Sequence, residues 1–138
     1  MELVIYTDGA SRKNPGESAS GYEIFNKDGT IIAKKSMYNG IKTNNEAEYI
    51  AVIEALRVAK EKFGADCEIT LYSDSQLIVN QMNGKFKVRE PGLKKLHALA
   101  REIASRFKRI AFVSVPRENE HITDVDAGLN ELLDSMGK

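Results

Sequence analysis

The chain has 138 residues, of which 42% are hydrophobic and 29% charged, so it can form one domain with its own core and is too apolar to be disordered. Its formal net charge is zero, which excludes the overall positive field of many nucleic-acid-binding proteins and leaves only local patches. A single cysteine, Cys67, excludes an internal disulfide, and no apolar run is long enough to span a bilayer. With no leader-like N-terminus, these features predict a cytoplasmic protein with a single domain over 1–138.

The first half of the chain predicts three strands and a helix. The apolar run 2–8 ends at Gly9, and residues 20–40 contain two further strands that meet at a hairpin turn, "KDG". Residues 43–65 place apolar side chains at helical spacing and have Gly64 near their end, so they predict a helix of several turns.

The second half of the chain alternates strands with helices. We expect strands at 67–74 and 109–116, a short helix at 75–84 and longer helices at 93–107 and 124–136. Polar loops are expected at 85–92 and 117–123. This order predicts an α/β fold, a mixed sheet with helices on both faces. The hairpin strands are antiparallel in such a sheet, and strands separated by helices can run parallel.

Two predicted strands end in the same way, "YTD" at Asp8 and "YSD" at Asp74. If these strands are parallel neighbours, both carboxylates lie at the carboxyl ends of the strands, where open α/β sheets bind ligands. A single Asp there is by default a turn residue. Two in matching contexts favour a shared site.

Two further acids are selected by the helix faces on which they lie. At about 100° per residue, Glu48 shares the apolar side of its helix with Val52, whereas Glu46 lies on the solvated side as a first-turn acid. In the last helix, Asp126 borders the apolar stripe and Asp124 lies on the far side. Asp126 could instead complete a capping box with Thr123 as N-cap, so both readings stay open.

Carboxylates gathered at one edge of the sheet repel each other and cannot all stay ionised without compensation. Hard divalent cations remove the repulsion, and an oxygen-only ligand set suits Mg²⁺ or Mn²⁺. Two such ions side by side are the common arrangement for phosphodiester cleavage.

Four motifs in this order, "TDGASRKNPG", "TNNEAEY", "SDSQ" and "VPRENEHITDVDAGLN", resemble the type 1 ribonuclease H family over essentially the whole chain. The resemblance implies a ribonuclease H-like five-stranded mixed sheet with three antiparallel strands followed by strands parallel to the first. It also implies endonucleolytic hydrolysis of the RNA strand of RNA–DNA hybrids with two Mg²⁺ ions, Mn²⁺ being a substitute, giving 5′-phosphate and 3′-hydroxyl ends. The family's catalytic, metal-binding carboxylates match Asp8, Glu48, Asp74 and Asp126 by motif position.

The same resemblance implies roles for four polar residues. Asn14, Asn44 and Gln76 match positions that contact the RNA, partly in the minor groove, where 2′-hydroxyls distinguish RNA from DNA. Thr43 matches a position that holds a phosphate of the DNA strand. Asn44 could also be a helix cap, and Asn14 a turn residue before Pro15.

The chain departs from the family pattern in three places. More residues separate Asn119 from Asp126 than in many members, so Asp124 remains an alternative ligand. His121 falls in the loop where some members carry an auxiliary His, but not at a matching position, and we expect it to be inert, as we expect His97 to be structural. The chain resembles a short form without the family's basic protrusion and without an N-terminal hybrid-binding domain.

A basic cluster remains in place of the protrusion and could contact the DNA backbone or act only as a solubilising surface: Lys85, Lys87, Arg89, Lys94 and Lys95, with Phe86 among them. Two other functions compete with the enzyme: a module that binds hybrids without cutting them, and an exonuclease or strand-transfer enzyme on the same fold. We expect a monomer with no obligate protein partner and no membrane association.

Overall fold

The computed structural model describes residues 1–138, and its five strands form one sheet in the order β3-β2-β1-β4-β5. β1 is antiparallel to β2, as is β2 to β3, while β4 runs parallel to β1 and β5 parallel to β4. The predicted sheet is therefore confirmed. The strands are β1 (Glu2–Ser11), β2 (Gly16–Asn26), β3 (Ile31–Lys42), β4 (Glu68–Ser73) and β5 (Arg109–Ser114). The helices are α1 (Asn44–Phe63), α2 (Gln76–Met82), α3 (Pro91–Ala104) and α4 (Glu120–Ser135).

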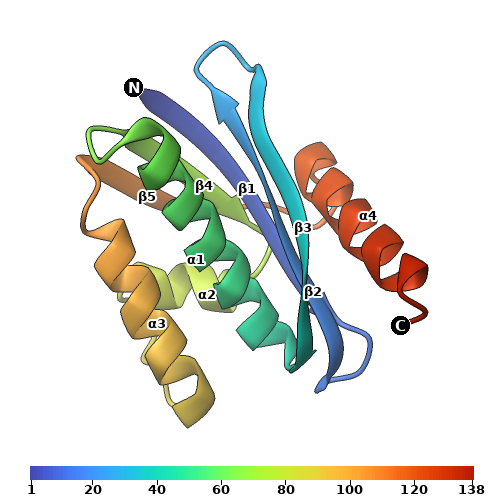
Figure 1. The fold of residues 1–138 in the computed structure, drawn as a ribbon. Coiled ribbons are helices and arrows are strands. Elements are labelled where there is room, and N and C mark those ends of the chain that lie inside the picture. Colours follow the sequence, from blue (N-terminus) through green and yellow to red (C-terminus); the bar gives the residue numbers. More distant parts are fainter.

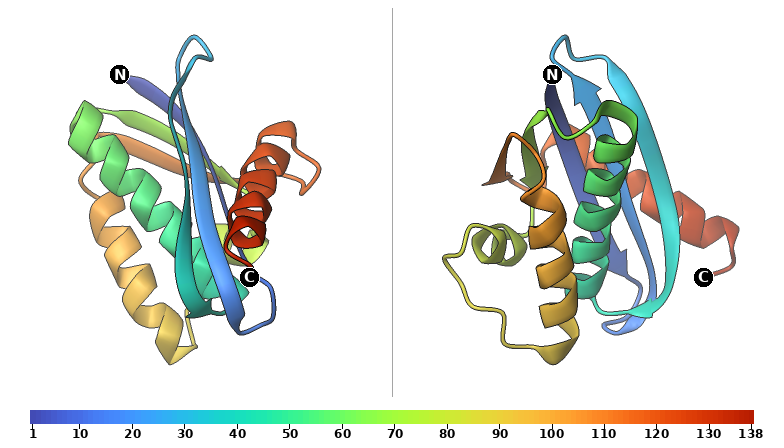
Figure 2. Two further views of the ribbon diagram at one scale, coloured as in Figure 1. Left: turned by 45° about the vertical axis from the view of Figure 1, so that its right-hand side comes forward. Right: turned by 60° about the vertical axis from the view of Figure 1, so that its left-hand side comes forward.

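The helices cover the two faces of the sheet unequally (Figures 1 and 2). α1 and α3 lie side by side on one face, α2 lies beside α3 near β5, and α4 lies alone on the other face. The main core is between the sheet and α1, with residues such as Ile5, Leu56 and Leu71, whereas Leu129 and Leu133 of α4 pack in a smaller cluster against Ala19 of β2. None of these helices has the length and apolarity that a transmembrane segment needs.

The pairing of β1 and β4 places two acids level with each other. Tyr6 is opposite Tyr72 in the parallel register, so Asp8 and Asp74, each two residues further on, lie at the same height. β1 does not end at Gly9 as we predicted, because its antiparallel pairing with β2 continues to Ser11. Asp8 therefore projects from a strand held on one side by β2, beyond the last pair with β4.

The last helix begins earlier than the sequence predicts. α4 starts at Glu120, not at residue 124, and its N-cap is Asn119, whose Oδ1 accepts hydrogen bonds from the backbone N–H groups of His121 and Ile122. The alternative that the sequence left open, a capping box of Thr123 with Asp126, is therefore not formed. Ile122 is buried in the first turn, and its packing accounts for the longer helix.

Gly9 allows β1 and α1 to approach each other closely beside Asp8 and Glu48. A Cβ atom at position 9 would lie 2.3 Å from the carbonyl carbon and oxygen of Ala47 and 2.6 Å from the backbone nitrogen of Glu48. We expect Gly9→Ala to lower the free energy of unfolding by about 2–4 kcal/mol, because helix and strand must separate. Denaturant titration measures this value.

The matched control for this substitution is Gly92→Ala in α3. A Cβ atom there would meet only the Oε2 atom of Glu46, at an ordinary 3.5 Å, and alanine suits a helix better than glycine. We expect Gly92→Ala to leave stability unchanged or slightly raised. Equal stabilities of the two variants would contradict the close approach at Gly9.

Candidate active site

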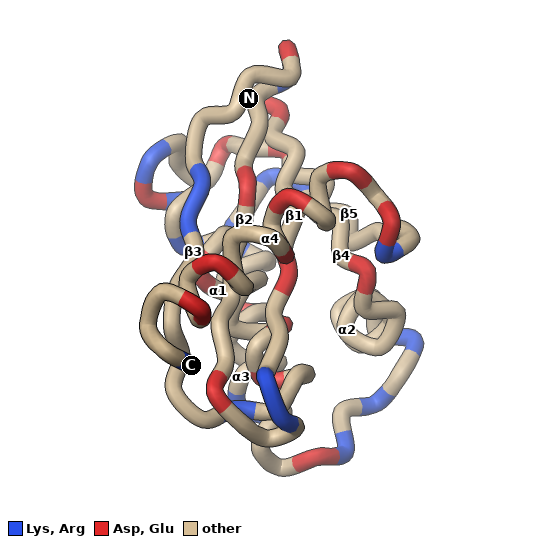
Figure 3. The backbone as a smooth tube through the Cα atoms, turned by 90° about the vertical axis from the view of Figure 1, so that its right-hand side faces the viewer, with Lys and Arg blue, Asp and Glu red and all other residues tan.

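Four acids from four separate parts of the chain line one cleft of about 720 Å³. Asp8 comes from β1, Glu48 from the second turn of α1, Asp74 follows β4, and Asp126 comes from α4. Carboxylate oxygens of Asp8, Glu48 and Asp74 all lie within 4.8 Å of one another. Figure 3 looks onto this side of the molecule, with acidic stretches on α4 and at the end of β4 and basic ones on the loop between α2 and α3.

The carboxylates are buried enough to disturb each other's ionisation. Burial, followed by the charges of Asp74 and Asp126, raises the pKa of Asp8 from 3.8 to about 8. Burial and the charges of Asp8 and Asp74 raise the pKa of Glu48 well above its usual value. The pKa of Asp74 is also raised by burial, against the opposing effect of the Arg117 guanidinium. Ionising all of these carboxylates at once therefore costs free energy unless a cation is bound between them.

The donor set fits a hard divalent cation. Glu48 is 7% exposed, and its Oε1 atom is buried with no hydrogen-bond partner. A carboxylate oxygen in that condition loses its hydration without compensation. The cluster of Asp8, Glu48 and Asp74 offers only oxygen ligands, which are those that Mg²⁺ and Mn²⁺ prefer.

The two alternatives in α4 lie in different surroundings. Asp126 lines the cleft and interacts with Asp8, whereas Asp124 is exposed and lies beside Glu23 and His121. The geometry thus brings Asp126, and not Asp124, to the other three acids.

The predicted RNA-contacting residues are only partly brought to the cleft. Asn44 lines it, but Asn44 is the first residue of α1 and not its cap. Its Oδ1 accepts from the backbone N–H of Ser11 (2.8 Å), and its own N–H donates to Oδ1 of Asn14 (3.0 Å). Gln76 is exposed at the start of α2 and is not among the cleft-lining residues.

The N-cap of α1 is Thr43, in a full capping box with Glu46. The Thr43 hydroxyl accepts from the Glu46 N–H at 3.1 Å, and the Glu46 carboxylate accepts from the Thr43 N–H at 2.9 Å. This box starts the helix at Asn44, four residues before Glu48, and so fixes the direction in which Glu48 points. Thr43 is half-buried, and capping occupies its hydroxyl oxygen as an acceptor.

Sequence reasoning missed Arg117 and Glu118, which also line the cleft. Arg117 follows Pro116 just beyond β5, and its guanidinium favours the charged form of Asp74. A signal was present, because β5 is parallel to β4 and residues beyond its carboxyl end reach the same edge of the sheet.

Neither histidine faces the carboxylates of the cleft. His97 packs edge-on against Tyr49, and its Nε2 lies 3.2 Å from the carbonyl oxygen of Gln81. His121 is not in a loop, as we predicted, but in the first turn of α4, where its ring contacts Tyr6 and Phe25.

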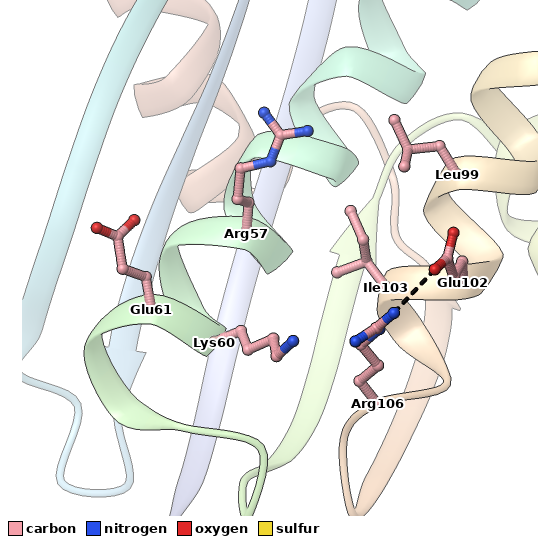
Figure 4. A pocket seen from close by; sticks show the side chains of 7 residues that line it. All are labelled: Arg57, Lys60, Glu61, Leu99, Glu102, Ile103 and Arg106. Atoms are coloured by element: carbon pink, nitrogen blue, oxygen red, sulfur yellow. Dashed lines mark hydrogen bonds and ion pairs between the residues drawn. The ribbon is translucent and has the colours of Figure 1, made fainter.

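A second cleft, of about 440 Å³, lies between α1 and α3 (Figure 4). Both of its arginines are paired: Arg106 with Glu102 at 2.9 Å within the cleft, and Arg57 with Glu54, outside it, at 3.0 Å. All of these groups are on helix surfaces and none is buried. This cleft therefore lacks the buried, mutually repelling groups of the first.

Comparisons with known proteins agree with this geometry. The sequence model of one family, described as RNase H, matches residues 1–122. The chain is 40% identical over 139 residues to the bifunctional protein Rv2228c of Mycobacterium tuberculosis, and 41% identical over 129 residues to ribonuclease HI of Halobacterium salinarum. These alignments cover 100% and 94% of this chain. Among solved structures, LC11-RNase H1 in complex with an RNA/DNA hybrid aligns with a TM-score of 0.91 and 38% identity, over 99% of both chains.

The curated relatives are longer than this chain. It spans 37% of the length of the mycobacterial protein and 63% of that of the halobacterial one, which is less than two thirds of either. The solved structure, by contrast, matches it end to end.

Proposed function

Since this chain belongs to the ribonuclease H family, we propose that it hydrolyses the RNA strand of RNA–DNA hybrids by internal cuts that leave 5′-phosphate and 3′-hydroxyl ends. The observation that carries the proposal is the convergence of Asp8, Glu48 and Asp74, whose oxygens lie within 4.8 Å of one another. The similarity to LC11-RNase H1, which was solved with a hybrid bound, supports the choice of substrate.

The family depends on divalent metal ions, and we propose Mg²⁺ as the ion in this chain. Asp8, Glu48 and Asp74 would hold it, with Asp126 as a further ligand on the α4 side of the cleft. When bound, divalent ions supply an activated water and stabilise the leaving oxygen of the phosphodiester. The acid side chains form no covalent bond with the substrate in this scheme.

The remaining cleft residues would position the substrate. The guanidinium of Arg117 lines the cleft and favours the charged form of Asp74. The same group would bind a phosphate of the substrate at the cleft. Asn44 presents a side-chain amide nitrogen that can donate to a 2′-hydroxyl, because its Oδ1 is already bonded to Ser11. Its backbone link to Asn14 holds these two candidate RNA contacts together. Gln76 and Thr43 remain predicted contacts of the RNA and of the DNA phosphate, respectively.

The basic loop between α2 and α3 provides a second contact region, for the DNA strand. It carries Lys85, Lys87 and Arg89, and Phe86 is 51% exposed among them. Figure 3 shows basic residues along this loop. Such a surface binds phosphates through charge alone, so affinity for the hybrid should fall steeply with salt.

The experiment that tests the function uses a hybrid whose RNA strand is labelled along its length, with Mg²⁺ present. We expect internal cuts in the RNA strand only, and no cuts after chelation of the metal or in duplex DNA of the same sequence. Stepwise trimming from one end would contradict the proposal in favour of an exonuclease. Retarded but intact hybrid would contradict it in favour of a binding module.

A further inference from the structure

A second group of metal-ligating side chains lies on the α4 face, outside the cleft. Glu23 of β2 and two residues of α4, His121 and Asp124, place a carboxylate oxygen, an imidazole nitrogen and a second carboxylate oxygen within 4.8 Å of one another. None of the three lines the cleft. We propose that this trio binds a divalent transition-metal ion of the Zn²⁺ class. The inference does not rest on the proposed function.

Glu23 is the observation that points to a ligand. Its side chain is on the sheet face that α4 covers, opposite Tyr6 in the β1–β2 register, and it is only 2% exposed. Its Oε2 atom pairs with Lys34 at 3.1 Å, but its Oε1 atom is buried and has no hydrogen-bond partner. A carboxylate oxygen buried in this way is costly unless something binds it.

His121 faces that oxygen with a donor of its own. Its ring lies against Tyr6 and Phe25, at centroid distances of 4.4 and 4.8 Å, which fixes the orientation of the imidazole. Its Nδ1 atom is also buried without a hydrogen-bond partner and lies 3.9 Å from Oε1 of Glu23. That gap is too long for a hydrogen bond, but it accommodates an ion about 2.1 Å from each atom, since two such ligands can be up to about 4.2 Å apart.

Asp124 completes the trio from one helical turn further along. Residues three apart share a helix face, so His121 and Asp124 point to the same side of α4. Asp124 is exposed, so its side chain can rotate to bring a carboxylate oxygen to a common ion. Residues two apart point to different sides of a helix, so Asp126 lines the cleft while Asp124 lies with Glu23 and His121.

The ligand chemistry distinguishes this site from the acidic cluster in the cleft. The cleft offers oxygens alone and suits Mg²⁺, whereas an imidazole nitrogen with two carboxylates suits Zn²⁺ and its neighbours in the first transition row. Lys34 neutralises one charge of the trio without occupying Oε1 of Glu23. The competing arrangement, a protonated His121 that pairs with Glu23 and leaves no place for an ion, is an outcome of the test below.

The test is a calorimetric titration of Zn²⁺ into the full chain carrying Asp8→Asn and Asp74→Asn, which disable the cluster in the cleft. We expect one bound Zn²⁺ per chain. Adding His121→Phe keeps an aromatic ring against Tyr6 and should weaken binding about tenfold or more, because it removes the nitrogen ligand. Adding His97→Gln, which changes the other histidine, should leave the affinity unchanged.

Nuclear magnetic resonance gives a second measurement that needs no change at position 121. In the chain with both Asp substitutions, Zn²⁺ should shift or broaden the ring signals of His121 and leave those of His97 in place. The proposal is overturned if the folded protein takes up no Zn²⁺, if His121→Phe binds Zn²⁺ as tightly as its parent, or if the signals of His121 do not respond.

Discussion

Replacing Glu48 by Gln is expected to slow cleavage of the RNA strand of a hybrid by about a thousandfold, which corresponds to about 4 kcal/mol of transition-state stabilisation. Glu48 and Asp8 are the two most buried acids of the cleft, and a carboxylate oxygen of Glu48 lies within 4.8 Å of oxygens of Asp8 and Asp74. The substitution keeps the volume of the side chain and removes its charge. Single-turnover rates at saturating Mg²⁺ measure the loss at the chemical step.

The matched control is Glu46→Gln, two residues earlier on the same helix. Gln serves in a capping box as Glu does, so this variant should keep both the fold and the cleavage rate. Losses of similar size in the two variants would place the effect in the helix and not in the cleft, and would contradict the role assigned to Glu48.

α4 offers a second matched pair. Asp126→Asn should slow cleavage strongly, because Asp126 interacts with Asp8, and Asp124→Asn should leave the rate near that of the unchanged chain. A larger loss of rate in Asp124→Asn than in Asp126→Asn would contradict this assignment and make Asp124 the metal ligand.

Local patterns were sufficient to predict that the acids converge on one cleft. The similar strand endings at Asp8 and Asp74 correctly indicated that the two acids lie together, because parallel pairing places equivalent positions of β1 and β4 level with each other. The helical period then separated Glu48 from Glu46, and Glu48 is indeed buried. Both inferences use regular geometry that does not depend on the rest of the fold.

The start of α4 could not be predicted in the same way. Asn119 and Thr123 are both good N-caps, and a helix that begins at either position satisfies the local pattern. Tertiary packing decides between them, since Ile122 is buried and the His121 ring contacts Tyr6 of β1. The meeting of His121 with Glu23 depends on the same choice, so it too was beyond reach from the sequence.

Raising the pH from about 4 to about 8 is expected to destabilise the metal-free protein. Asp8 has a pKa of about 8 in the folded chain, against its usual 3.8, because of burial and the charges of Asp74 and Asp126. Between these values the folded state binds a proton that the unfolded state has released, so the free energy of unfolding falls as pH rises. The contribution of protonated Asp8 to the free energy of unfolding is fully present below pH 4 and is lost as the pH rises through 8.

The loss from Asp8 alone is on the order of 6 kcal/mol, at about 1.4 kcal/mol per unit of pKa. Urea titrations across this pH range, with chelator present, measure it. Asp8→Asn cannot ionise and should flatten the curve, whereas Asp28→Asn, in the exposed turn between β2 and β3, should not change it. Mg²⁺ competes with protons for the same carboxylates, so it should stabilise the chain far more at pH 8 than at pH 5. Equal stabilisation at both values would mean that these acids do not hold the ion.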